Sequence, residues 1–368
     1  MPIVVKASEL DINSDHRFFG GIMLKMSKQT FGAVVGGVLL MAGTAWAAQG
    51  EPAKDLGASY KMAPEWAHPL PNGRQWGSTS AVQVDPDGVH IWALDRCGGS
   101  NCTNSMADTV LKIDPSGKVV KQFGAGLMII PHGITVDKDR NVWVTDYGVD
   151  EAAHKGLQVF KFSPEGKILM TLGKAGVSGE GPDTFIAPSD VLIAPNGNIF
   201  VSDGHAFVKT LKARIVVFSP EGKFLRQFAK YGTAQGEIMD PHALAMDSKG
   251  RLFVGDRENN RIQIFDQNGK SLAIWKQFGR PCGMAIDKSD TLYSVDCESQ
   301  GTNQAERGYN PGFKHMVSIG SAATGQVTGT LVNPPFNDAE GIAVDAAGNI
   351  YGAEVRSKTG GVHKYVKQ

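Results

Sequence analysis

Three residues of metal-binding type and two arginines occupy matching places in an internal repeat of this chain. His132, His242 and Glu340 each stand directly before a short apolar segment. Arg96 and Arg257 each follow an aspartate that ends the next apolar segment. Two imidazoles and one carboxylate with an open position form a typical catalytic zinc site, and the same donors suit iron or manganese. The pattern predicts a divalent-metal site with two arginines beside it.

Two further side chains are candidates for moving a proton at this site. Tyr147 follows the aspartate of its own repeat as the two arginines do, and His205 lies one residue beyond the matching position. Their unperturbed pKa values differ, about 10 for tyrosine and about 6.5 for histidine, so they suit different proton transfers. Structural roles compete with these assignments. Arg257 fits an ion pair between neighbouring repeats equally well, and His205 fits a solvated loop histidine.

The repeat itself must bring these residues together. An apolar segment of the type Gly-Ile-Thr-Val is followed by a polar turn and by a segment of the type Val-Trp-Val-Thr-Asp. The turns are rich in Asp, Gly and Asn, which indicates β-hairpins. The six copies are residues 81–95, 133–146, 190–203, 243–256, 283–296 and 341–354.

A second hairpin follows most copies, for example residues 157–172, 214–228 and 261–275. Each repeat is therefore predicted to be a four-stranded antiparallel meander. Because one meander cannot bury both of its faces, the repeats must pack around an axis. We predict an all-β fold, a six-bladed β-propeller; no segment shows the sustained 3.6-residue period of a helix. The last repeat ends one strand short, and we expect a segment around residues 65–70 to supply its outer strand and close the ring.

In such blades the first strand begins, and the second strand ends, at the same end of the ring. Long insertions at residues 98–107, 148–155, 206–213 and 298–314 belong to that end, whereas the other end has only tight turns. Function is therefore expected at one mouth of the channel. Two rings of residues should line this mouth: Ser80, His132, Ser189, His242, Cys282 and Glu340, and then Arg96, Tyr147, Gly204, Arg257, Cys297 and Val355.

The N-terminal 47 residues are interpreted as an extension and a secretory signal peptide. Lys25 and Lys28 precede the apolar residues 31–41, and Ala45-Trp46-Ala47 resembles a cleavage site. The apolar stretch is shorter than the roughly 20 residues that span a bilayer, so we expect no membrane span after cleavage. The predicted mature product is an exported propeller of residues 48–368, periplasmic or secreted.

Export permits disulfide bonds, and the chain has four cysteines. Cys97 and Cys102 close a short Gly/Ser/Asn loop. Cys282 and Cys297 hold matching positions of one hairpin, so their Cβ atoms should face each other. We predict two disulfides, and prefer this interpretation of the second pair to metal ligation.

Composition excludes several classes of partner. The 37 basic residues balance the 37 acidic ones, and no block of like charge occurs, which argues against nucleic acid and charged membrane surfaces. Hydrophobic residues make up 42% of the chain, a composition typical of a soluble globular protein. We expect a monomer that acts on a small molecule or a peptide.

Several motifs resemble the lyase part of the peptidylglycine amidating enzymes, within the wider class of NHL-repeat propellers. They are Ile130-Pro131-His132-Gly133-Ile134, Val201-Ser202-Asp203-Gly204 and Asp256-Arg257-Glu258-Asn259-Asn260-Arg261. The resemblance is good over residues 80–265 and poor in the last two repeats. It implies a zinc-dependent lyase that splits a peptidyl-α-hydroxyglycine into a peptide amide and glyoxylate. On this basis His132 and His242 match two of three histidine ligands, and Arg96 and Arg257 match the substrate arginines.

The chain departs from the family pattern at three positions. Glu340 stands where the third histidine is expected, Gly341 replaces the acid that follows it, and His205 replaces the family tyrosine. The second change puts the structural calcium of the family in doubt. Two other functions stay open: a metal-dependent esterase or lactonase, and a non-catalytic propeller that binds a peptide or another ligand. Histidines at two ring positions argue against an esterase of the calcium type, whose ligands are mainly acidic and amide groups.

Overall fold

The computed structural model describes residues 53–64, 66–205, 211–332, 338–355 and 360–368. The predicted signal peptide lies outside these residues. Residues 49–368 form one compact unit, and the description below concerns that unit alone. Among the described residues, no helix is long and apolar enough to cross a membrane.

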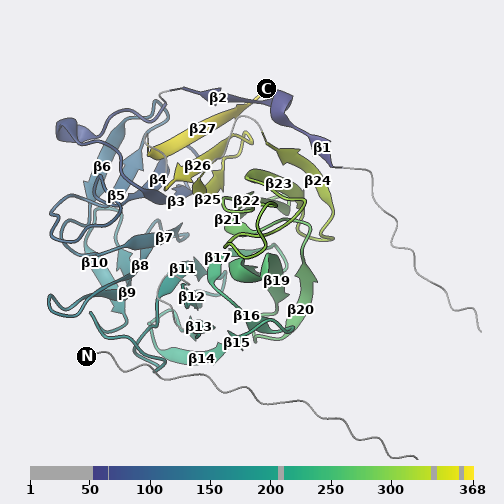
Figure 1. Cartoon of the computed structure of the whole chain (residues 1–368). Coiled ribbons are helices and arrows are strands. Elements are labelled where there is room, and N and C mark those ends of the chain that lie inside the picture. The colour runs from purple at the N-terminus through teal and green to yellow at the C-terminus, as the bar shows by residue number, and fades with distance from the viewer. Residues whose placement is uncertain (1–52, 65, 206–210, 333–337, 356–359) are drawn as a thin grey trace, which may run out of the picture. The chain divides into compact units, whose positions relative to one another are not determined.

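Six sheets follow one another around a central axis (Figure 1), which confirms the predicted six-bladed propeller. The first blade consists of β3 (Thr79–Val84), β4 (Ile91–Asp95), β5 (Val110–Ile113) and β6 (Val119–Phe123). The second consists of β7 (Pro131–Val136), β8 (Val142–Asp150), β9 (Lys155–Phe162) and β10 (Ile168–Leu172). The third consists of β11 (Pro188–Ile193), β12 (Ile199–Asp203), β13 (Arg214–Phe218) and β14 (Phe224–Phe228).

The next three blades are β17 (Pro241–Met246), β18 (Leu252–Asp256), β19 (Arg261–Phe265) and β20 (Ser271–Trp275); β21 (Pro281–Ile286), β22 (Thr291–Asp296), β23 (Met316–Ser321) and β24 (Val327–Leu331); and β25 (Ala339–Val344), β26 (Ile350–Glu354), β27 (Gly361–Lys367) and β2 (Tyr60–Ala63). A short strand, β1 (Lys54–Asp55), adds to the fifth sheet in parallel with β24. The pair β15 (Lys230–Tyr231) and β16 (Glu237–Ile238) and the 3-10 turns η1 (Gly57–Ser59), η2 (Pro71–Gly73) and η4 (Arg257–Asn259) complete the elements of the described residues.

The strand that pairs with β27 is β2, at Tyr60–Ala63, not the segment around residues 65–70. The prediction of its position was wrong by a few residues. Pro64, Pro69 and Pro71 have no backbone N–H, so the segment that contains them is a poor ladder partner.

The acid that ends the second segment of each repeat in the sequence anchors the chain that enters its blade. The backbone N–H groups of Ile129 and Ile130 donate to Asp146 at 2.8 and 2.7 Å, and Ile186 and Ala187 donate to Asp203, each at 2.8 Å. Burial raises the pKa of Asp146 and of Asp203 to about 6. These acids hold the inner strands in register and have a structural role.

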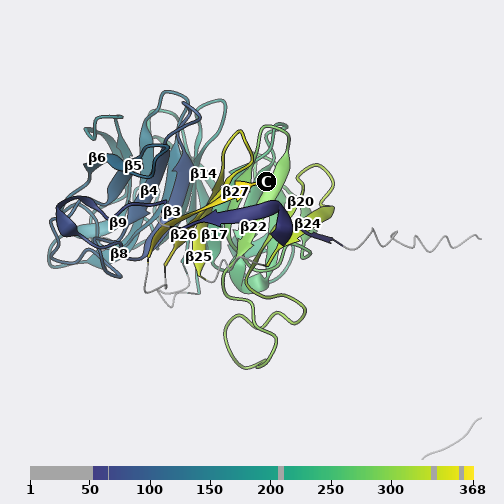
Figure 2. The same cartoon turned by 90° about the horizontal axis from the view of Figure 1, so that it is seen from above.

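The opposite ends of these hairpins are tight turns built by aspartate. Asp137 accepts hydrogen bonds from the N–H groups of Asp139 and Asn141, and Asp287 accepts them from Ser289 and Thr291. The side chain thus replaces backbone partners within its own turn. Apolar side chains fill the space between neighbouring sheets, as in the cluster of Trp92, Phe123 and Phe162. In the side view, the yellow-green connection between β22 and β23 projects from one end of the ring (Figure 2).

Candidate metal and substrate site

The predicted ring of residues lies at a backbone irregularity that is present in every blade. The sequence placed His132 and its equivalents just before the inner strands, but each is the second residue of its strand. Pro131 pairs with Asp146 and Ile134 with Val144, so the register shifts at the intervening residues. A comparable shift occurs in all six inner hairpins. Such β-bulges re-aim side chains, here into the channel.

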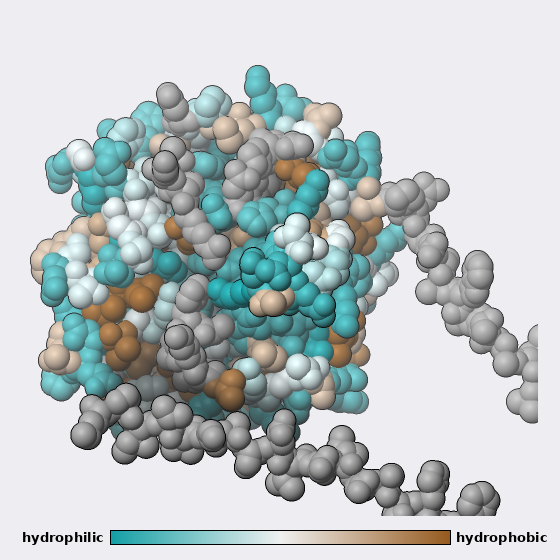
Figure 3. All heavy atoms as spheres, in the orientation of Figure 1, coloured by the Kyte–Doolittle hydropathy of each residue, from teal (hydrophilic) through white to brown (hydrophobic). Residues whose placement is uncertain are grey.

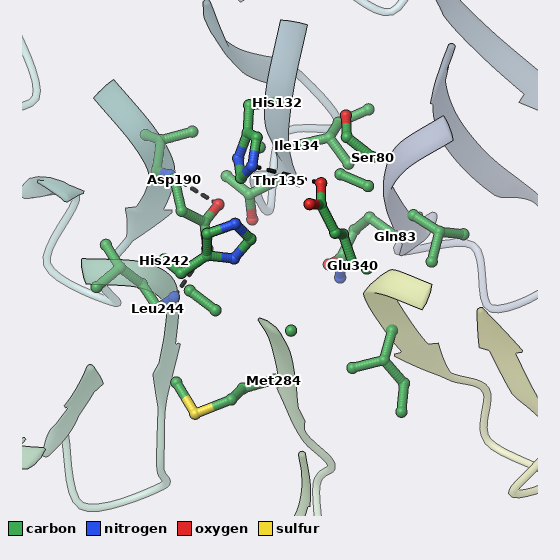
Figure 4. Close-up of a pocket in the computed structure, with 18 of the residues that line it drawn as sticks. Ser80, Gln83, His132, Ile134, Thr135, Asp190, His242, Leu244, Met284 and Glu340 are labelled. Carbon is green, nitrogen blue, oxygen red and sulfur yellow. Dashed lines mark hydrogen bonds and ion pairs between the residues drawn. The ribbon is translucent and has the colours of Figure 1, made fainter. Parts of the chain in front are cut away.

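A small cavity of about 70 Å³ lies along the channel among the inner strands. His132, His242 and Glu340 point toward a common space (Figure 4). All three are buried, with exposed fractions of 2% to 6%. On the face shown in Figure 3, hydrophilic side chains gather right of the centre, and hydrophobic ones form only scattered patches.

Among the described residues, three histidines form a group that could hold a metal ion. One ring nitrogen from each of His132, His205 and His242 lies within 4.8 Å of the others, and all three residues are buried. The Nε2 atoms of His132 and His205 are 3.2 Å apart. Two zinc–nitrogen bonds of about 2.0–2.1 Å at a tetrahedral angle would place two nitrogens roughly 3.3 Å apart. The spacing therefore fits two ligands of one metal ion.

Two of these histidines are held in the orientation and tautomer that a metal ligand needs. His132 Nδ1 lies 2.7 Å from the carbonyl oxygen of Ser189, and His242 Nδ1 lies 2.5 Å from that of Cys282. A ring nitrogen that bonds a carbonyl oxygen must carry its proton, which leaves the Nε2 lone pair free for a metal. His242 Nε2 is buried without a hydrogen-bond partner among the described residues. This donor set fits zinc.

The environment favours neutral imidazoles, the form that binds metals. Burial is the main cause that lowers the pKa of all three histidines well below the usual value. Positive charge adds to the effect, from Arg96 at His132 and from Arg257 at His242. A metal ion would therefore not compete with protons for these nitrogens near neutral pH.

The histidine group shares His132 and His242 with the predicted ligand set, and its third member is His205, which was expected to transfer protons. Glu340 is not part of this group, although its Oε2 lies 3.6 Å from His132 Nε2. Gly204, the residue before His205, has a φ of 130°, a backbone conformation that favours glycine. A Cβ atom at this position would lie 2.5 Å from the Lys212 carbonyl oxygen. Glycine is thus required at the residue that delivers His205 to the channel.

Both predicted arginines lie beside the histidines. The guanidinium of Arg96 is 3.6 Å from Glu340 Oε2 and 5.9 Å from the ring centre of Tyr147. Arg257 is fully buried, and its Nε donates to Asp240 at 2.7 Å. Burial alone would lower the pKa of Arg257, but Asp240, followed by Glu298 and Glu340, raises it. Asp240 belongs to the same blade, so the ion pair predicted between neighbouring repeats corresponds to the longer contact of NH1 with Glu298 Oε1, at 3.8 Å. Both terminal nitrogens lack a hydrogen-bond partner within the described chain.

The remaining predicted residues also converge on this mouth. The ring of Tyr147 stacks on His205, with centres 4.3 Å apart, and meets the edge of His132 at 5.3 Å. Burial is the largest cause that raises the pKa of Tyr147. Tyr147 is therefore placed to support the histidines. The two predicted disulfides are confirmed, Cys97–Cys102 and Cys282–Cys297.

The sequence analysis missed the charged network behind Arg257. Arg280 is 1% exposed, and its NH2 is 2.6 Å from a carboxylate oxygen of Glu258 and 3.0 Å from one of Glu298. Its NH1 also donates to the Arg257 carbonyl oxygen at 2.7 Å. From the long β22–β23 connection, Arg307 approaches Glu298 at 3.2 Å. Arg280 lies two residues before Cys282, one of the residues predicted to line the mouth, and this spacing could have identified it as a site residue.

Comparisons with known proteins agree with the fold and with the predicted resemblance. The family model of the NHL repeat matches residues 239–265. The peptidyl-alpha-hydroxyglycine alpha-amidating lyase 1 of Drosophila melanogaster is 32% identical over 339 residues, covering 80% of this chain and 58% of that protein. The peptidyl-glycine alpha-amidating monooxygenase B of Xenopus laevis is 41% identical over 246 residues, covering 60% of this chain and 27% of that protein.

The probable peptidyl-alpha-hydroxyglycine alpha-amidating lyase pgal-1 of Caenorhabditis elegans is 34% identical over 210 residues, covering 52% of this chain and 56% of that protein. The chain thus spans less than two thirds of the length of these relatives.

Solved structures share the fold at low identity. A gluconolactonase from Xanthomonas campestris has a TM-score of 0.54 and 15% identity, covering 80% of this chain and 88% of that one. A streptogramin B lyase also has a TM-score of 0.54, at 13% identity, covering 86% of this chain and all of the other. The NHL-repeat match and the sequence relatives confirm the interpretation of the motifs. The chain is a six-bladed propeller with an NHL-repeat match at residues 239–265, and it resembles the peptidyl-α-hydroxyglycine α-amidating lyases.

Proposed function

We propose that the protein is a zinc-dependent lyase that cleaves the carbon–nitrogen bond of a peptidyl-α-hydroxyglycine or a related α-hydroxy-amide. The products are an amide and glyoxylate. The observation that carries the proposal is a three-histidine donor set beside buried guanidinium nitrogens of Arg257, which have no hydrogen-bond partner among the described residues. The lyase names of the relatives support the same reaction.

His132, His205 and His242 would hold the metal. Zinc, when bound, supplies Lewis acidity, which makes a nearby hydroxyl group a stronger acid. The carbonyl groups of Ser189 and Cys282 fix two of the rings, so the site needs little rearrangement.

Arg257 would bind the carboxylate of the substrate. Asp240 holds its Nε and orients the guanidinium plane, which leaves NH1 and NH2 to form two parallel bonds to a carboxylate. Arg96 lies across the site, where its Nε donates to the Pro131 carbonyl oxygen at 3.1 Å. It would orient the amide end of the substrate and stabilise charge that develops there.

We also propose an exported location, periplasmic or secreted. The two disulfides support it, because such bonds persist mainly in oxidising compartments.

The test combines metal analysis with an activity assay on the purified full chain. We expect about one equivalent of zinc per chain and glyoxylate release from an N-acyl-α-hydroxyglycine. A chelator should remove both, and added zinc should restore both. Metal content below about a tenth of an equivalent, or full metal content without glyoxylate release, would contradict the proposal. Peptide binding without turnover would instead support a binding propeller, and hydrolysis of esters or lactones would support an esterase.

A further inference from the structure

Glu340 is a buried carboxylate that faces the site but does not belong to the histidine group. Its Oε2 lies 3.6 Å from His132 Nε2 and 3.6 Å from Arg96 NH2. Its Oε1 lies 3.9 Å from Arg257 NH1. These contacts are too long for hydrogen bonds, and Oε2 is buried with no hydrogen-bond partner in the described part of the chain. A buried acceptor of this kind is costly unless a ligand donates to it.

The unsatisfied atoms of the site are complementary to one kind of ligand. Arg257 offers two donors, His242 Nε2 offers a lone pair, and Glu340 Oε2 offers an acceptor. A carboxylate would accept from Arg257, and a hydroxyl group on the neighbouring carbon would donate to Glu340. An α-hydroxy acid derivative carries both groups in this relation, so one such molecule could satisfy both ends of the site.

We propose that Glu340 is the proton acceptor and donor of the lyase reaction; this inference rests on the proposed function. The Glu340 carboxylate removes the proton from the substrate hydroxyl group. An oxygen electron pair then forms the C=O bond of glyoxylate, and the carbon–nitrogen bond breaks with its electron pair on nitrogen. Glu340 returns the proton to that nitrogen, which yields the amide and restores the carboxylate. No oxidant, reductant or water is consumed.

Of the other candidates, His205 is already engaged, because it directs Nε2 at the same point as His132 Nε2, where the metal would lie. Tyr147 keeps its hydroxyl group, but its ring stacks on His205, and among the described residues no ion pair orients it as Arg96 and Arg257 orient Glu340. By contrast, Arg96 and Arg257 flank Glu340 from two other blades and orient its carboxylate without occupying Oε2.

The decisive variant is Glu340→Gln, which keeps the shape of the side chain and removes its ability to accept the proton. We expect kcat for glyoxylate release to fall at least about 100-fold, in the range typical of a lost general base. Zinc content should stay near that of the wild type, and binding of the unreactive N-acylglycine, measured by calorimetry, should change less than about threefold. Glu354→Gln, the same change in the same blade, is the matched control and should leave kcat unchanged.

Each outcome decides between roles. Loss of zinc in Glu340→Gln would make Glu340 a ligand, and retention of kcat within about tenfold would exclude proton transfer; either result overturns the proposal. If the glutamine variant does not fold, Glu340→Ala with added formate replaces it. Rescue of kcat by formate supports the proposal, and its absence overturns it. A wild-type protein that releases no glyoxylate overturns the proposed function itself, whereas an active wild type with an equally active variant overturns only the role of Glu340.

Discussion

The two ends of the propeller use the same repeat in different ways. At the turn end, one aspartate recurs in the same role, as Asp137 and Asp287 show by accepting N–H groups of their own turns. At the mouth, the second residue of the inner strand differs in type between blades: these residues are Ser80, His132, Ser189, His242, Cys282 and Glu340. The repeat builds the scaffold where it is uniform and supplies chemistry where it varies.

The ends also differ in how their polar groups are satisfied. Turn carboxylates bond to adjacent backbone, so each turn is complete by itself. At the mouth, His242, Arg257 and Glu340 keep buried polar atoms without hydrogen-bond partners among the described residues. Such groups lower stability unless a ligand satisfies them, so ligand binding should stabilise the mouth far more than the turns.

The largest contrast is expected for the metal. His242→Ala removes one of the three proposed ligands and the ring that bonds to Cys282, so zinc content should fall below about a tenth of an equivalent. Asp287→Ala at the turn end should retain the wild-type content. Elemental analysis of both purified variants tests this. Full zinc content in His242→Ala would mean that the mouth does not hold the metal.

The next effect concerns substrate binding at the mouth. Arg257→Lys keeps a positive charge beside Asp240 but loses the pair of parallel donors. We expect kcat/KM to fall about 10- to 100-fold, since a hydrogen bond to a charged group contributes about 1.5–3 kcal/mol. Zinc content should not change. Steady-state kinetics with an N-acyl-α-hydroxyglycine measures the effect. An unaltered kcat/KM would mean that Arg257 has only a structural role.

A pH effect is expected from the acid that ends β26. Burial raises the pKa of Glu354 to about 7, against about 4.3 in an unfolded chain. The native state therefore binds the proton more strongly, so its stabilising contribution is complete below about pH 4.3 and is lost as the pH rises through 7. Glu354→Gln should remove this loss, and its stability relative to the wild type should rise by about 2–3 kcal/mol between pH 4.5 and 8.

Urea unfolding of chelator-treated wild type and Glu354→Gln at both pH values measures this difference. Chelator treatment keeps pH-dependent metal binding out of the comparison. A constant difference between the two proteins would show that Glu354 titrates normally.

The smallest effect is expected at the turn end. Asp287→Ala removes two hydrogen bonds to the N–H groups of Ser289 and Thr291, which can then bond to water. The free energy of unfolding should fall by about 1 kcal/mol, with kcat unchanged. A loss of activity in this variant would break the contrast between the two ends.

Much of the fold was predictable because the repeat is explicit. The hairpin turns, the second-strand acids and the two disulfides follow from local spacing. The position of the closing strand β2 was not predictable in the same way. It pairs Tyr60 with Lys367 at the other end of the chain, and strand pairing over that separation leaves no local sequence signal.

The sequence by itself determined the six-bladed architecture and the set of residues that reach one mouth, because strand alternation and turn chemistry are local properties. Only the tertiary structure decided which of these residues meet. His205 joins His132 across 73 positions of sequence because Gly204 turns the chain toward the channel, and Glu340 is left beside the two arginines. Distances across a ring depend on how neighbouring blades pack, and no single repeat contains that information.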